Sequence, residues 1–223
     1  EQMLALIFLI LSCLIFFSLY EQTYGSWLAF TDRLLTRDVL GWNMTPAQST
    51  SIGAFFIVGL SPVFAWLWPF LDKRGLNPSK PMKSVIGLAF GGLAFVPLWL
   101  AAKSISTASP VASIWWLMLA YFVIELGEMS LSPIGLAAVS QLSVKRVTAL
   151  MMGTWFLATA YSEVIAAAFG KLTSLDQVEA TDVVVAAAKY GNLFQWMVWL
   201  GLGSAVLYLV LVKPLSTWMH GEK

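Results

Sequence analysis

Four glutamates lie inside or at the edge of long apolar runs, where a charged side chain is costly. Glu125 and Glu128 are three residues apart in one run, Glu163 lies in a later run, and Glu21 lies toward the end of the first. An ionised carboxylate in hydrocarbon costs several kcal/mol, so such residues face a water-filled cavity, are protonated, or pair with a cation. Proton transfer and cation binding are therefore the chemistry that these residues can perform.

The basic residues are distributed differently from these glutamates. All 13 Lys and Arg residues fall in polar connections or at the ends of apolar runs. None of them is expected to neutralise a glutamate in the middle of a run. The missing partner is therefore a proton, a substrate amine or a second set of helices outside this chain.

A local pattern surrounds the first pair of glutamates. Glu125 and Glu128 project toward the same side of a helix, because residues three apart are neighbours on its surface. Pro133, which follows Ser132, removes one backbone hydrogen bond, and we expect a helix break there. A broken helix beside a carboxylate at membrane depth is typical of ion and substrate sites in transporters. The alternative is a structural glutamate that bonds to a serine or to backbone at a helix contact.

A later run carries an aromatic ring, a hydroxyl and a carboxylate on one stripe. Trp155, Thr159 and Glu163 recur at intervals of four residues, so they share one face of a helix. Such a stripe suits the wall of a binding pocket. The alternative for Trp155 is a packing role between helices.

The elements that must position these residues are membrane-spanning helices. Apolar residues make up 59% of the chain and charged residues 11%, against about 45–50% and about 25% in soluble domains. A spanning helix needs about 20 mostly apolar residues. Thr45 as cap and Pro46 as first helical residue mark the start of the second segment. The sequence predicts an all-α polytopic membrane protein in a lipid bilayer, with residues 1–223 as one bundle of six helices at about 3–30, 48–71, 82–102, 112–142, 147–172 and 192–212.

Lys and Arg near the helix ends predict the orientation, because cytoplasmic loops are enriched in them. If the first helix starts in the cytoplasm, eight basic residues, Lys223 included, lie on that side and five lie outside. Four of the eight belong to one connection: Lys73, Arg74, Lys80 and Lys83. We therefore expect a multi-pass protein of the inner cell membrane with both ends of this segment cytoplasmic. The start at Glu1, without an initiator Met or signal-peptide features, resembles a cut inside a longer polypeptide.

Several classes of function lose support. The net charge of +1 gives no indication of a nucleic-acid partner. One cysteine, Cys13, and one histidine, His220, leave no metal site with His or Cys ligands at the usual spacing. The sequence contains no G-x-x-x-x-G-K-[ST] loop, H-E-x-x-H helix or G-x-S-x-G elbow. We therefore expect neither a cofactor nor an enzymatic activity, and not an ATP-driven pump.

Four stretches carry a resemblance to a known family. They are GEMSLSPIGL at 127–136, MMGTWFL at 151–157, YEQ at 20–22 and SPVFAWLW at 61–68. They resemble the tenth, eleventh, seventh and eighth helices of the proton-coupled oligopeptide transporters of the major facilitator superfamily. The resemblance spans nearly the whole chain. It implies a six-transmembrane-helix half of that fold, with the N-terminal six-helix half of the same transporter as its partner.

The resemblance also implies roles for individual residues. Glu128 is expected to hold the amino terminus of a peptide, or a lysine of the absent half at the cytoplasmic gate. Glu21 is expected to be a protonation site coupled to an arginine on the first helix of that half. The implied function is symport of di- and tripeptides with protons by alternating access. The side-chain pockets would be lined by Phe17, Trp155, Phe156 and Thr159.

Four positions depart from the family pattern. The eighth helix commonly has an Asn nine residues before its Pro, and counting back from Pro62 gives Gly53, so one ligand for the peptide amine is missing. Glu125 stands where the family is usually apolar, and Glu163 where a small or amide residue is common. Phe17 stands where Trp is frequent. These departures leave the substrate range open.

Two other functions therefore remain alternatives to peptide transport. The first is a divergent family member that carries another small solute, motivated by Gly53, Glu125 and Glu163. The second is a non-transporting membrane subunit that scaffolds a partner. In that case the cations absent from the apolar runs belong to the partner.

Overall fold

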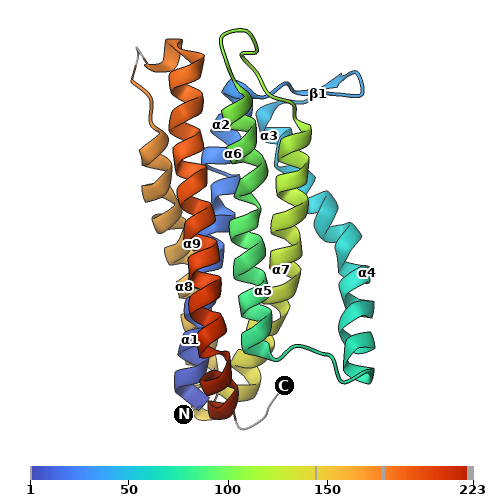
Figure 1. Cartoon of the computed structure of the whole chain (residues 1–223). Coiled ribbons are helices and arrows are strands. Elements are labelled where there is room, and N and C mark those ends of the chain that lie inside the picture. Colours follow the sequence, from blue (N-terminus) through green and yellow to red (C-terminus); the bar gives the residue numbers. More distant parts are fainter. Residues whose placement is uncertain (1, 144, 177–178, 220–223) are drawn as a thin grey trace.

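The computed structural model describes residues 2–143, 145–176 and 179–219, and its long helices run side by side from one end of the molecule to the other (Figure 1). Glu1, His220 and Lys223 lie outside the described residues. Among the described residues, five helical units are long and apolar enough to cross a membrane: 2–34, 46–73, 80–104, 148–173 and 183–218. A sixth long helix, α7 (Trp115–Leu142), runs beside them. The predicted all-α polytopic membrane fold is confirmed.

The first unit is not the single helix that the sequence predicts. It consists of α1 (Gln2–Tyr20), the 3-10 turn η1 (Glu21–Thr23) and α2 (Ser26–Leu34). Gly25, between η1 and α2, has φ −107° and ψ −99°, a conformation far from that of a helix. The α-helical hydrogen bonds are replaced by 3-10 bonds, which link residues three apart: Tyr24 N to Glu21 O and Gly25 N to Gln22 O, both 3.2 Å. The expectation of one helix over 3–30 is therefore wrong, because the chain breaks the helix at Glu21.

A short hairpin follows α2 at the upper end of the bundle (Figure 1). Strands β1 (Asp38–Val39) and β2 (Trp42–Asn43) pair antiparallel, with Val39 opposite Trp42. The turn between them has positive φ at both Leu40 (54°) and Gly41 (85°), as a two-residue type I′ turn requires. The hairpin returns the chain toward the bundle for its second crossing.

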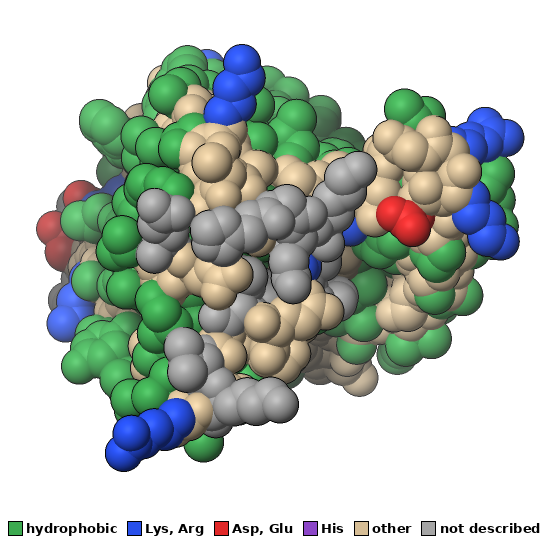
Figure 2. Space-filling model, turned by 90° about the horizontal axis from the view of Figure 1, so that it is seen from below, with side chains coloured by type: hydrophobic (Ala, Val, Ile, Leu, Met, Phe, Trp, Pro, Cys, Tyr) green, Lys and Arg blue, Asp and Glu red, His purple; other side chains and the backbone are tan. Residues whose placement is uncertain are grey.

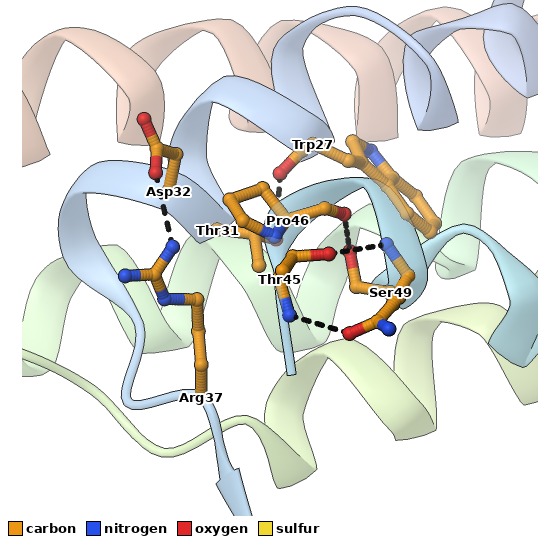
Figure 3. A network of polar contacts seen from close by, with 8 residues as sticks. Trp27, Thr31, Asp32, Arg37, Thr45, Pro46 and Ser49 are labelled. Atoms are coloured by element: carbon orange, nitrogen blue, oxygen red, sulfur yellow. Dashed lines mark hydrogen bonds and ion pairs between the residues drawn. The ribbon is translucent and has the colours of Figure 1, made fainter. Parts of the chain in front are cut away.

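The second crossing begins with α3 (Pro46–Ser49), and its start agrees with the sequence-based prediction. Thr45 Oγ1 accepts a hydrogen bond from Gln48 N at 3.2 Å, and Thr45 N donates to Gln48 Oε1 at 2.9 Å (Figure 3). This reciprocal pair is a capping box, which satisfies backbone donors that the first turn leaves free. Close to it, Arg37 forms an ion pair with Asp32 of α2 at 3.1 Å, so both ends of the hairpin connection are fixed (Figure 3).

The helix α4 (Ser51–Lys73) lies apart from the other helices along much of its length (Figure 1). Among the long helices it packs mainly against α7. Several of its large side chains are turned outward, among them Phe55 (76% exposed) and Val58 (74% exposed). In a membrane protein, such side chains face lipid or another set of helices.

The remaining helices form the core of the bundle. The helices α5 (Lys80–Leu93) and α6 (Phe95–Ser104) pack along α9 (Val183–Trp218), and α1 contacts α5, α7, α9 and α8 (Thr148–Gly170). The backbones of α5 and α9 approach closely at Gly92 and Gly201, where a Cβ on Gly92 would lie 2.9 Å from Gly201 Cα. Small residues of this kind let helix backbones approach closely in membranes.

Two predictions about the helices need correction, one about a break and one about a starting residue. The helix break expected at Ser132 and Pro133 is wrong, because α7 is helical without interruption over its 28 residues. A proline removes only one backbone bond, and membrane helices tolerate that loss where neighbouring groups compensate. The last helix begins at 183 rather than at 192, because Asp182 caps it by accepting hydrogen bonds from Val184 N and Val185 N.

Candidate substrate and proton site

The most deeply buried carboxyl group belongs to Glu125 of α7, whose side chain is 0% exposed. Its Oε1 accepts a hydrogen bond from the Tyr20 hydroxyl at the end of α1, at 3.2 Å. Among the described residues, its Oε2 is buried without a hydrogen-bond partner. An unpartnered carboxylate oxygen in apolar surroundings is unfavourable, so this position favours either a proton or a cation.

Glu128 lies one helical turn further along α7 and is half-buried. Its Oε2 is also buried and has no hydrogen-bond partner among the described residues. Between the two glutamates, Gly127 allows α7 to approach α1 and α5, since a Cβ there would lie 2.9 Å from Phe16 Cε2 and 3.0 Å from Gly87 O. The helix that carries both carboxyl groups is therefore held by close backbone packing.

Glu21 and Glu163 form a second acidic site at the interruption of the first unit. Both line a cavity of about 240 Å³ together with Tyr24, Gly25 and three small residues of α8. Glu21 is half-buried in η1, whereas Glu163 is exposed on α8. The break after α1 therefore turns Glu21 toward α8.

The side chain of Gln22 fixes this break. It is 0% exposed, and its Nε2 donates to the carbonyl oxygen of Ala166 on α8 at 2.9 Å. Its Oε1 accepts a hydrogen bond from the Ser26 hydroxyl at 2.7 Å. One amide thus connects η1, α2 and α8, and it holds Glu21 at the mouth of the cavity.

We expect Gln22→Leu to lower the free energy of unfolding by about 1–3 kcal/mol, because it removes two buried hydrogen bonds. Thermal unfolding of the purified protein in detergent measures the change. The matched control is Gln195→Leu at a half-buried position of α9, which should change stability by less than about 0.5 kcal/mol. Equal effects of the two substitutions would contradict the role assigned to Gln22.

Glu125 and Glu21 lack a basic neighbour in the part of the chain that the structure describes. The side chains that interact with the carboxyl group of Glu125 are Glu128 and Tyr20, and those that interact with the carboxyl group of Glu21 are Glu163 and Glu128. These interactions link the two acidic sites through Glu128. The described residues also contain no group of three or more His, Cys, Asp or Glu side chains that could hold a metal ion.

The aromatic and hydroxyl residues singled out in the sequence lie in different places. Phe17 is half-buried and its ring packs edge-on against Tyr20, with centroids 6.1 Å apart, so it adjoins the Glu125 site. Trp155 is 3% exposed and its indole fills the space beside Gly135 of α7, which is a packing position. Phe156 is 60% exposed, and Thr159 donates to the Phe156 carbonyl oxygen at 2.8 Å.

The structure also brings together two positions that the sequence separates by 72 residues. A Cβ on Gly53 of α4 would lie 2.7 Å from Glu125 Oε1 and 3.2 Å from Tyr121 Cδ1. The carboxyl group of Glu125 therefore occupies the space that a side chain at position 53 would need. Sequence reasoning missed Tyr20, Gln22 and Tyr121, although the first two adjoin Glu21 in the YEQ stretch.

Comparison with known proteins gives one consistent result. Residues 1–193 match the POT family. The chain is 32% identical over 223 residues to the peptide transporter YePEPT of Yersinia enterocolitica, covering 100% of this chain and 42% of that protein. It is 32% identical over 212 residues to dipeptide and tripeptide permease A of Klebsiella pneumoniae, covering 95% of this chain and 41% of the permease.

The solved structures agree with the sequence matches. A crystal structure of a peptide transporter POT in complex with sulfate superposes with a TM-score of 0.79 at 29% identity, covering 98% of this chain and 41% of that one. The same transporter carrying an E310Q substitution, in complex with alafosfalin, gives a TM-score of 0.79 and covers 42% of that chain. The chain therefore spans less than half the length of the relatives that it matches.

Proposed function

Because the chain belongs to the POT family of membrane transporters, we propose that it is the C-terminal six-helix half of a proton-coupled symporter of di- and tripeptides. The observation that carries this proposal is the buried acidic pair Glu125 and Glu128, whose unpartnered oxygens need a cation or a proton. A peptide contributes an ammonium group, and the membrane gradient contributes the proton. The family transports solutes and performs no enzymatic conversion.

The proposed mechanism couples the peptide and the proton through two carboxylates. An ionised Glu128 attracts the peptide ammonium, or a lysine of the absent half when the site is empty, and an ionised Glu21 pairs with an arginine of that half. Protonation of Glu128 or Glu21 removes the negative charge of that group and releases its own ion pair, because a carboxyl group in a medium of low dielectric is neutral unless a cation is near. The two six-helix halves then rock around the site, which is alternating access.

The outward-facing surface of α4 supports a second set of helices as the partner. Phe55 and Val58 are exposed on this helix, which lies apart from the bundle (Figure 1). The relatives are more than twice as long as this chain, so an N-terminal half of similar size is available to cover part of that surface. We propose that this half also supplies the cations that Glu21 and Glu128 lack.

We further propose an inner-membrane location with both ends of this segment in the cytoplasm. The start of α1 and the end of α9 lie at the same end of the bundle as the connection between α4 and α5 (Figure 1). Viewed from that end, basic side chains stand around the rim of the molecule (Figure 2). Lys73 and Arg74 belong to this connection, in agreement with the enrichment of basic residues in cytoplasmic loops.

The direct test is uptake by the full-length protein in proteoliposomes. An inward proton gradient should drive accumulation of a labelled dipeptide, and collapse of the gradient by a protonophore should abolish it. Excess unlabelled dipeptides and tripeptides should compete, whereas free amino acids should not. Competition by another class of solute alone would instead support a divergent transporter, a possibility raised by Gly53 and Glu125.

Binding of dipeptides tests the alternative that the protein is a scaffold without transport activity. A ligand that binds only the folded protein raises its stability by RT ln(1 + L/Kd), where L is the free ligand concentration, so the effect grows with the logarithm of that concentration. Thermal stabilisation by dipeptides, but not by free amino acids, therefore excludes a pure scaffold. Absence of both stabilisation and gradient-driven uptake would contradict the proposed function.

A further inference from the structure

Glu125 has no assigned part in the mechanism above, although it is the most buried acidic side chain of the site. Its 0% exposure means that neither water nor a peptide ammonium reaches it directly in this arrangement. Glu128, one helical turn further along α7, is half-buried and therefore more accessible than Glu125. A role for Glu125 must therefore pass through its neighbours.

The neighbours of Glu125 offer hydrogen bonds but no positive charge. Tyr20 of α1 donates to its Oε1 at 3.2 Å, and Gly53 of α4, which has no side chain, adjoins the same oxygen. No Lys, Arg or His of the described residues is among the side chains that interact electrostatically with its carboxyl group. The titratable groups that face it from α1, from the segment after η1 and from α7 are Tyr20, Tyr24, Tyr121 and Glu128.

Two adjacent carboxyl groups in buried, apolar surroundings do not both ionise. Each has one buried oxygen without a partner among the described residues, Glu125 Oε2 and Glu128 Oε2. The two carboxyl groups also interact electrostatically with each other. Adjacent carboxyls of this kind share one proton, because two like charges at close range in an apolar medium repel strongly. In such a pair the fully buried member retains a proton more readily than the half-buried one, because burial disfavours the charged form.

We propose that Glu125 and Glu128 act as one proton-sharing pair, in which protonated Glu125 donates a hydrogen bond to ionised Glu128 and so keeps Glu128 ready for a cationic ligand. Glu125 is thus a positioning residue, and Gly53 is the residue that makes room for it. This inference rests on the proposed function, since it concerns the same site. The shared proton stays on Glu125 Oε2 while Glu128 exchanges ligand cation and transported proton.

Binding of a dipeptide to the full-length protein as a function of pH tests the inference. Binding needs ionised Glu128, so it is lost as the pH falls and Glu128 takes up a proton. Glu125→Leu removes the donor that stabilises the ionised form, so the midpoint of this loss should move upward by about one pH unit. Glu125→Gln keeps an N–H donor, and its midpoint should stay within about 0.3 units of the unsubstituted protein.

Two glycine variants on α4 give a second test that leaves both carboxyl groups in place. Gly53→Ala places a methyl group 2.7 Å from Glu125 Oε1, so it should displace Glu125 and change the midpoint. Gly59→Ala is the matched control, because no described atom lies within 4 Å of a Cβ there. Its midpoint should be unchanged.

The possible outcomes separate this inference from the proposed function. If Glu125→Leu and Gly53→Ala both keep the midpoint of the unsubstituted protein while peptide uptake persists, the proton-sharing pair is wrong and peptide symport stands. Equal upward shifts for Glu125→Leu and Glu125→Gln also overturn it, since the amide should replace the donor. If the unsubstituted protein neither binds nor takes up dipeptides, the proposed function itself fails.

Discussion

We expect Glu128→Gln to lower gradient-driven dipeptide uptake in proteoliposomes by at least about tenfold. The amide has nearly the same shape as the carboxyl group, but it neither ionises nor carries a proton. It therefore loses the charge-assisted bond to the peptide ammonium, and such bonds contribute about 1.5–3 kcal/mol. It also loses the proton that would release the ion pair. Initial rates of labelled-dipeptide uptake, with and without an inward proton gradient, measure both effects.

The control for this substitution is a carboxylate far from the site. Glu179 lies outside the predicted spans and pairs with Lys189 at 2.6 Å, and this hydrogen bond lowers the pKa of Glu179. Glu179→Gln should leave uptake unchanged, because no step of the proposed mechanism involves that loop. Glu21→Gln should lower proton-driven uptake as Glu128→Gln does. Undiminished uptake in both Glu21→Gln and Glu128→Gln contradicts the assignment to peptide symport.

Gly201→Ala produces the largest loss of stability that we expect from a single methyl group. A Cβ at this position would lie 2.5 Å from Gly92 N, closer than real Cβ atoms approach backbone. The obstacle is the main chain of α5 and no rotamer change removes it, so the two helices must separate. Overpacking of this kind costs about 1–3 kcal/mol. Thermal unfolding of the full-length protein in detergent should show a lower Tm.

The same helix supplies the control for that prediction. Gly203 lies two residues further along α9, and no described atom is within 4 Å of a Cβ built there. Gly203→Ala should keep or slightly raise the Tm, because alanine favours helix more than glycine does. A Tm of Gly201→Ala equal to that of Gly203→Ala would show that α5 and α9 do not touch at Gly92.

The features that sequence reasoning predicted correctly depend on local chemistry. The cap at Thr45 involves residues that are three positions apart, and its structure is the capping box with Gln48. The long apolar runs likewise mark the helical segments, because a membrane requires long apolar helices whatever their packing. The acidic residues in those runs were recognisable for the same reason, since each is unusual in its own run.

The features that were missed depend on contacts between distant segments or on competing local signals. Pro133 predicted a break that α7 does not have, while the actual break lies before Gly25 in the first unit. A proline is tolerated or not according to its neighbours, and no local rule decides this. The position of Trp155 against Gly135 required knowledge of how α7 and α8 cross. Neither the tolerance of Pro133 nor the packing of Trp155 against Gly135 can be predicted from the sequence of one helix alone.

The contact between Gly53 and Glu125 has a consequence for how this protein diverged from its relatives. A side chain at position 53 and a glutamate at position 125 compete for the same space, since a Cβ at the first would lie 2.7 Å from an oxygen of the second. A homologue with a larger residue at 53 would therefore have no room for an acid at 125 in the position seen here. Among homologous sequences, these two positions should change as a pair, and a glutamate at 125 should occur beside glycine.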